Sequence, residues 1–193
     1  MNNITEAELD KVIALLDTIR SKAKTDDWLN DEWGLFIRKM RLLNPQAYGP
    51  RIQNYLFDKL GWERVPAHLD KGDVRNSLGQ YFETKVSLIT PKNQAVNIVQ
   101  VRPWQQISGH HIFVVDTTNQ YRLFHFSLSK NEMRAEIELI GNSAHGTAKA
   151  VRDNINKEYR LSIPWITTHP IYQRWIKQYL QTNTNNALIK RKE

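Results

Sequence analysis

Four short segments between residues 80 and 127 decide the fold: QYFETKVSLI (80–89), VNIVQVR (96–102), HIFVVD (111–116) and QYRLFHFS (120–127). Each segment is rich in β-branched and aromatic residues, which favour strands. Turn-like pieces, TPKNQ and TTNQ among them, separate the segments. The pattern predicts four strands that follow one another as an antiparallel meander.

The flanks of this region have the 3.6-residue period of helices. Upstream, apolar residues form three helical stripes, Leu9–Ile19, Leu29–Leu43 and Tyr48–Leu60, and Gly61 is placed to stop the third. Downstream, we predict helices at 130–139, 145–158 and 168–181. This order predicts an α+β (α/β-like) single domain with a central mixed or antiparallel sheet flanked by helices. Its parts are a helical region (1–61), the sheet (62–127) and a helical, basic region (128–193).

Composition excludes several classes of protein. The 193 residues suffice for one domain with a sizeable core. The chain has no cysteine, which excludes disulfides, thiolate metal sites and a cysteine nucleophile. No apolar run approaches the roughly 20 residues of a membrane span, and we expect a soluble, cytoplasmic protein. No GxxxxGK[ST] or GxGxxG motif occurs, so no nucleotide cofactor is expected.

The formal net charge is +7 and is unevenly spread. Residues 1–33 contain eight acids and four bases, whereas residues 139–192 contain nine bases and two acids. Such a basic region favours a polyanionic partner, for example nucleic acid.

The residues best suited to chemistry lie at the start of the first predicted strand. Asp73 follows Gly72 in a turn, and Glu83 and Lys85 lie two apart in the strand. Side chains alternate along a strand, so Glu83 and Lys85 project from one face, about 7 Å apart. Two carboxylates and an ammonium would then converge on a small volume.

Such a group suits phosphodiester hydrolysis, which needs a hydroxide-like nucleophile and neutralisation of the charge that develops on the phosphate. Mg²⁺ provides both, and it prefers a few carboxylate oxygens together with waters and phosphate oxygens. Asp73 and Glu83 would hold the metal, with the backbone carbonyl of Thr84 as a further ligand. Lys85 would orient the attacking water and stabilise the developing charge.

The arrangement Asp73, nine intervening residues, then Glu83-Thr84-Lys85 resembles the active site of the PD-(D/E)xK nuclease superfamily, which includes type II restriction endonucleases. The resemblance spans roughly residues 50–127, and Gly72 stands where the family pattern has proline. It implies a restriction-endonuclease-like core and Mg²⁺-dependent cleavage. The alternative for the triplet is an ordinary salt bridge on a surface strand.

Other acids compete for roles in this site. Asp70 is an alternative to Asp73 as the first acid, and Gly72-Asp73 favours Asp73 because it makes a sharp turn. Asp116 ends a later strand and could approach the site; the alternative is an acid that simply ends a strand at a turn. Glu63 is a candidate accessory ligand or a plain surface residue.

Gln100 and Arg102 share a face of the second predicted strand. If that strand pairs beside Glu83 and Lys85, both side chains approach the trio. The resemblance implies that Gln100 orients a water or contacts the phosphate. Arg102 is either a phosphate clamp or an arginine stacked on Trp104.

The predicted helix 145–158 is the candidate for DNA contact, since free N–H groups at a helix start bind phosphate. Its candidate DNA-binding residues are His145, Lys149, Arg152, Asn154 and Lys157. The alternative is a solvated helix face. The histidines of the chain show no metal-ligand spacing.

These observations predict a Mg²⁺-dependent endonuclease of type II restriction character that cleaves double-stranded DNA at a short specific sequence. A palindromic site favours a homodimer, with the helical first third as a candidate dimer contact. Two alternatives remain: a structure-selective or repair nuclease on the same core, and a non-catalytic DNA-binding protein.

Overall fold

The computed structural model describes residues 5–22, 32–69, 71–143 and 158–182, and the chain divides into two units, residues 1–55 and 56–193. Helices α1 (Glu6–Lys22), α2 (Trp33–Met40) and α3 (Pro45–Leu60) follow the three predicted apolar stripes. In the first unit, Phe36 of α2 stacks on Tyr55 of α3 with ring centroids 4.3 Å apart. None of the described helices is both long and apolar enough to cross a membrane.

The stripe of α1 forms a helix, yet the other described residues do not bury its apolar face. The side chains of Leu9, Val12 and Ile13 are each about half exposed. Helix α3 ends as predicted at Gly61, whose φ of +67° is a conformation that glycine adopts without steric cost.

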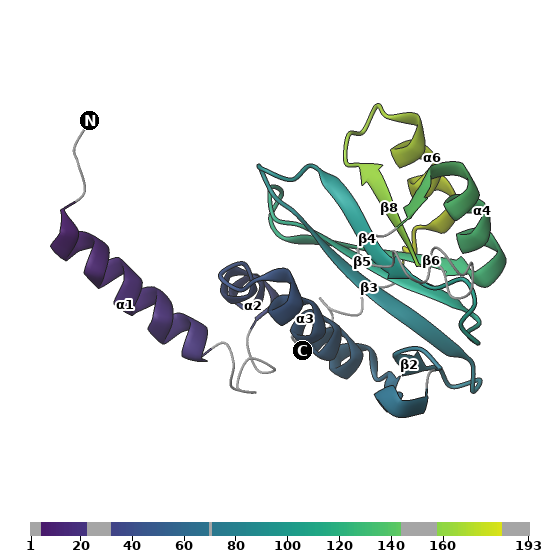
Figure 1. Cartoon of the computed structure of the whole chain (residues 1–193), viewed down its shortest axis with the longest axis horizontal. Coiled ribbons are helices and arrows are strands. Elements are labelled where there is room, and N and C mark those ends of the chain that lie inside the picture. The colour runs from purple at the N-terminus through teal and green to yellow at the C-terminus, as the bar shows by residue number, and fades with distance from the viewer. Residues whose placement is uncertain (1–4, 23–31, 70, 144–157, 183–193) are drawn as a thin grey trace. The chain divides into compact units, whose positions relative to one another are not determined.

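The second unit contains two sheets (Figure 1). The larger has the order β1-β2-β3-β5-β6 and the smaller the order β4-β8-β7. Their strands are β1 (Glu63–Arg64), β2 (Val74–Arg75), β3 (Tyr81–Ile89), β4 (Ala95–Val101), β5 (Gly109–Asp116), β6 (Arg122–Ser129), β7 (Gly141–Ser143) and β8 (Tyr159–Pro164). A short 3₁₀ helix, Ala67–Leu69, lies between β1 and β2.

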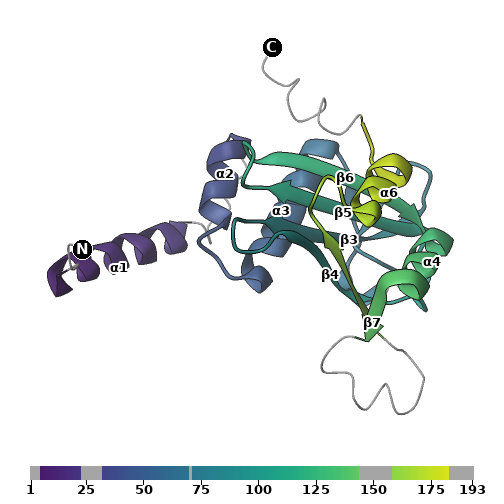
Figure 2. The same ribbon diagram turned by 90° about the horizontal axis from the view of Figure 1, so that it is seen from above.

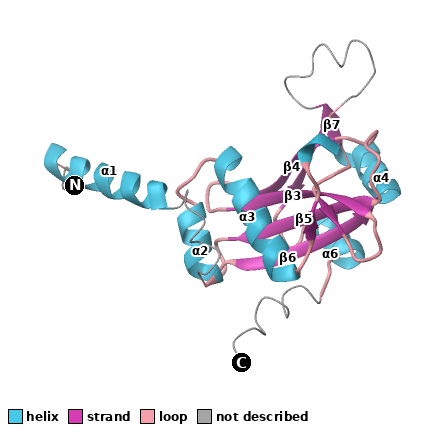
Figure 3. Ribbon diagram, turned by 90° about the horizontal axis from the view of Figure 1, so that it is seen from below, coloured by secondary structure: helices cyan, strands magenta, loops and turns pink. Residues whose placement is uncertain are grey.

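The predicted α+β class is confirmed, and the four predicted strands exist, but the predicted meander is wrong. Strand β3 pairs in parallel with β5, and β4 leaves that sheet to pair with β8. Figure 3 shows β3, β5 and β6 side by side. The composition of the segments and the turn residues between them show where strands lie in the sequence, but they do not show which strands pair with each other. The burial of nearly every residue of β5 on both faces is typical of an interior strand with a parallel neighbour.

The core of the second unit lies between the two sheets and two helices, α4 (Lys130–Ile140) and α6 (Pro170–Tyr179). Both helices were predicted from sequence and lie on the same side of the larger sheet (Figure 2). A capping box starts α4, because Ser129 and Glu132 exchange side-chain and backbone hydrogen bonds. Of the predicted helix 145–158, residues 145–157 lie outside the described residues; β8, which follows, was not predicted.

Candidate active site

The turn before β2 is hydrogen-bonded to the start of β3. Asp73 N donates to Phe82 O at 2.8 Å, and Val65 N donates to Asp73 O at 2.9 Å. Gly72 has a φ of +83°, and a Cβ there would lie 2.6 Å from Phe82 O. Proline, with φ near −65°, cannot adopt this backbone. The absence of the family's proline therefore follows from the local geometry.

The carboxylate of Asp73 is held against the edge of β3. Its Oδ2 accepts hydrogen bonds from Thr84 N at 2.7 Å and from Thr84 Oγ1 at 2.8 Å. The N–H and C=O groups of Thr84 therefore lie along the β3 edge that Asp73 occupies. The alternative first acid, Asp70, lies outside the described residues.

Glu83 and Lys85 project from one face of β3, as predicted. Lys85 Nζ lies 2.7 Å from Glu83 Oε1, and the two side chains are only 17% and 9% exposed. The pair is therefore largely buried, unlike the surface salt bridge considered as the alternative. A buried ion pair stabilises a fold little, because desolvating the two charges offsets their attraction.

The trio can supply a small set of oxygen ligands. Asp73 Oδ1 and Glu83 Oε2 accept no hydrogen bond from any described residue. The described residues contain no group of three or more His, Cys, Asp or Glu side chains arranged to hold a metal. Mg²⁺ requires fewer, since it keeps several waters and uses one or two carboxylates with substrate phosphates. One open oxygen on each of two carboxylates meets this requirement in number.

Gln100 does not reach the trio through sheet pairing, so the expected neighbouring-strand placement is wrong. Strand β4 pairs with β8, and its register shifts between Ile98 and Val101. Gln100 lies in this irregularity with a φ of +55° and is exposed, whereas Ile98 is buried. The irregularity breaks the alternation that placed the two residues on one face.

Arg102 has two neighbours in the second unit. Its Nε donates to Glu158 Oε1 at 2.8 Å, and its guanidinium lies 6.0 Å from the Trp104 ring centroid. This geometry agrees with the stacked alternative.

The two other candidate acids lie apart from the trio. Asp116 pairs in register with Ile89, six positions along the strands from the Glu83–His110 pair, which is about 20 Å. It accepts from Thr118 N, Thr118 Oγ1 and Trp165 Nε1. Glu63 is exposed and pairs with Arg75. The predicted DNA contacts His145, Lys149, Arg152, Asn154 and Lys157 lie outside the described residues.

The adjacent histidines of β5 face opposite sides of the sheet, as the alternation predicts. His111 Nδ1 lies 3.0 Å from His125 Nε2 on β6, a pair that the sequence analysis missed. Trp62 covers this pair, with ring centroids 4.6 Å from His111 and 5.8 Å from His125. Burial lowers the pKa of His111 to about 4 and that of His125 to about 3.

His110 lies on the same face of the sheet as Glu83, its neighbour in the parallel register. Burial, together with the charges of Lys85, His111 and Lys130, lowers its pKa to about 3. Lys130, the first residue of α4, donates a hydrogen bond from its ammonium to Gln105 O. Only the parallel pairing of β3 and β5 brings His110 to Glu83, and no pattern in the sequence indicates that pairing.

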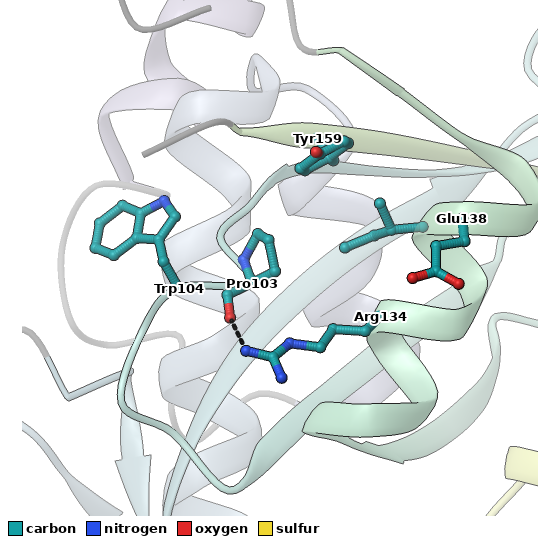
Figure 4. A pocket seen from close by; sticks show the side chains of 6 residues that line it. Pro103, Trp104, Arg134, Glu138 and Tyr159 are labelled. Atoms are coloured by element: carbon teal, nitrogen blue, oxygen red, sulfur yellow. Dashed lines mark hydrogen bonds between the residues drawn. The ribbon is translucent and has the colours of Figure 1, made fainter. Parts of the chain in front are cut away.

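A pocket of about 370 Å³ opens between the loop after β4, α4 and β8 (Figure 4). Arg134 spans it and donates to Pro103 O at 3.3 Å. Trp104 and Tyr159 line one side, and Glu138 places a carboxylate on the other. The charged side chains that line this pocket are thus one cation and one anion.

In comparisons with known proteins, no family model matches the sequence, and no curated protein matches it significantly. The resemblance to PD-(D/E)xK nucleases therefore rests on Asp73, Glu83, Thr84 and Lys85 and on their surroundings.

Proposed function

We propose that this chain is a Mg²⁺-dependent endonuclease that hydrolyses double-stranded DNA at a specific short sequence, in the manner of type II restriction enzymes. One observation carries the proposal: Asp73 is hydrogen-bonded to Thr84, which lies between the paired Glu83 and Lys85 on β3, and each of the two carboxylates keeps an oxygen that accepts no hydrogen bond from a described residue.

Each member of the trio has a part in this proposal. Asp73 Oδ1, Glu83 Oε2 and the Thr84 carbonyl would hold Mg²⁺, which lowers the pKa of a bound water and neutralises phosphate charge. One of the three N–H groups of Lys85 donates to Glu83, and the other two can donate to a water or a phosphate oxygen. The water oxygen bonds to phosphorus, the bond from phosphorus to the 3′ oxygen breaks, and a proton from the water ends on that leaving oxygen.

Charge outside the trio also supports a polyanionic substrate. Lys71 lies over the Tyr81 ring, 5.3 Å from its centroid, at the start of β3. The net charge of +7 would attract DNA over a Debye length of about 8–10 Å at ordinary ionic strength. A homodimer acting on a palindromic site in the cytoplasm belongs to the same proposal.

The test is digestion of a plasmid of mixed sequence by the purified chain with Mg²⁺. Discrete fragments with common end sequences support the proposal. Cleavage confined to branched or mismatched DNA would replace it with the structure-selective nuclease. Tight binding in EDTA without Mg²⁺-dependent cleavage would replace it with the non-catalytic DNA-binding protein. The control is Lys85→Met protein purified in the same way, which identifies any contaminating nuclease.

A further inference from the structure

Two buried side chains of the second unit, one of them beside Glu83, contain polar atoms with no hydrogen-bond partner among the described residues. His110 is 1% exposed, and neither Nδ1 nor Nε2 is bonded. Gln105 is 4% exposed, and its Oε1 is buried without a partner. Leaving a buried polar group unsatisfied costs about 1–3 kcal/mol, so each such group requires an explanation.

Among the described residues the one other such atom is Arg174 Nε on α6, whose guanidinium is already paired with Glu136 through its Nη2, whereas several buried polar groups near His110 are satisfied. Thr84 Oγ1 donates to Asp73, and Ser87 Oγ accepts from Asn97 N at 3.0 Å. His125 is hydrogen-bonded to His111 on the opposite face of the same sheet.

The two residues lie five positions apart on the segment that leads into β5 and its first residues. His110 is the cross-strand neighbour of Glu83 in the parallel pairing of β3 with β5. Lys130 is hydrogen-bonded to this segment twice: its ammonium donates to Gln105 O, and its backbone N–H donates to Ser108 O, just before β5. Lys85 and Lys130 both lie close enough to influence the charge of His110.

The chemistry of these groups selects their ligand. A neutral imidazole presents one N–H donor and one acceptor nitrogen, and the free oxygen of Gln105 is an acceptor. A phosphodiester oxygen only accepts and leaves both acceptors unsatisfied. Water donates two hydrogen bonds and accepts two, and buried waters make about three bonds to otherwise unsatisfied polar groups.

We propose that His110 and Gln105 bind a water molecule beside the Glu83–Lys85 pair and thereby position the water that hydrolysis consumes. The role in hydrolysis rests on the proposed nuclease function, whereas the water site itself does not. Both residues position the water without taking up its proton.

The water site is tested on the full chain by NMR, by measuring cross-relaxation from water to the His110 ring protons and the Gln105 amide protons. We expect cross-peaks with the sign of a water bound for longer than nanoseconds. The absence of such cross-peaks at both side chains overturns the site. This measurement requires no nuclease activity.

The role in hydrolysis is tested with Gln105→Met and His110→Phe, and exposed Gln94→Met is the matched control. We expect kcat for DNA cleavage to fall on the order of a hundredfold, because misplacing a reactant by an ångström has that effect. DNA affinity in Ca²⁺ should be unchanged, and Gln105→Met should unfold at the same or a higher urea concentration than the unmutated chain, because an unsatisfied group is removed.

Unchanged kcat in both variants, with active unmutated protein, overturns the role while the proposed nuclease stands. Absence of cleavage by the unmutated protein overturns the nuclease instead, and the NMR measurement alone then decides the water site. His110→Asn restores a donor and an acceptor, so partial recovery of kcat relative to His110→Phe is the further expected result. No recovery contradicts hydrogen bonding as the role of His110.

Discussion

Two buried glutamates of the second unit differ in the number of side chains that donate hydrogen bonds to their carboxylates. Glu136 on α4 is 3% exposed and accepts from three residues of α6: Arg174, Trp175 Nε1 at 2.9 Å and Tyr179 OH at 3.0 Å. Glu83 on β3 is 7% exposed and, among the described residues, accepts only from Lys85, which is on its own strand.

The difference separates a structural acid from a candidate functional one. Every contact of Glu136 crosses between two helices and fixes α6 against α4. Burial and the hydrogen bond to Glu136 raise the pKa of Tyr179 to about 12, so its hydroxyl stays a donor. Glu83 joins no two elements and keeps an oxygen open. Polar groups left incompletely satisfied in a folded chain are expected at functional sites.

The largest expected effect is on DNA cleavage and tests the functional role of Glu83 against the structural role of Glu136. Asp73→Asn, Glu83→Gln and Lys85→Met should each reduce DNA cleavage on the order of 10⁴-fold, since the three act as one unit. Glu136→Gln, assayed below its unfolding temperature, should cleave normally. Near-normal cleavage by Glu83→Gln or Lys85→Met would remove the trio from the chemistry.

The next effect is on stability, and here Glu136→Gln is expected to have the larger effect and Glu83→Gln the smaller one. Glu136→Gln should lower the free energy of unfolding on the order of 3 kcal/mol, because Arg174 loses its counter-charge and one of the two buried donors, of Trp175 and Tyr179, loses an acceptor. Glu83→Gln should cost less, since the long Lys85 side chain can carry its ammonium to solvent. Urea unfolding of both variants measures the difference, and equal losses would contradict the distinction.

The fold could be predicted from sequence in class and in most elements, and the site only in part. Periodicity and composition identified α1 to α4, α6 and strands β3 to β6, because the apolar residues of each helix recur at a regular period and the strands are rich in β-branched and aromatic residues. They did not identify the parallel pairing of β3 with β5, since partner choice depends on contacts distant in sequence. Glu83 and Lys85 were found because their pairing is local to one strand, whereas His110 lies beside Glu83 only through that long-range pairing.

A third prediction concerns the opposite face of the larger sheet. Burial holds the pKa values of His111 and His125 near 4 and 3, below the unfolded value of about 6.5. The unfolded chain therefore binds more protons at acidic pH, so this contribution to stability is complete above about pH 6.5 and is lost as the pH falls. His125→Gln should reduce the slope of unfolding free energy against pH by about 1.4 kcal/mol per unit between pH 6 and pH 4. An unchanged slope would mean that His125 titrates normally in the folded chain.

The smallest expected effect concerns DNA binding by the basic C-terminal region. Neutralising a side chain that pairs with one phosphate should lower the magnitude of the log–log salt slope of binding by about 0.9 for duplex DNA. Lys149→Ala with Arg152→Ala should show this reduction, and exposed Lys92→Ala serves as the control. A slope equal to that of the unmutated protein would assign both side chains to solvent.

The central claim is that a divalent ion lies between the carboxylates of Asp73 and Glu83 and the DNA phosphate. Without the ion these carboxylates repel the phosphate. The direct measurement is the affinity of the unmutated chain for a DNA duplex that it cleaves, by gel shift in EDTA, Ca²⁺ and Mg²⁺, beside Glu83→Gln. We expect the unmutated chain to bind weakly in EDTA, tightly without cleavage in Ca²⁺, and with cleavage in Mg²⁺, whereas Glu83→Gln binds in EDTA as well as in Ca²⁺. Equally tight, specific binding by the unmutated chain in all three conditions would contradict the claim.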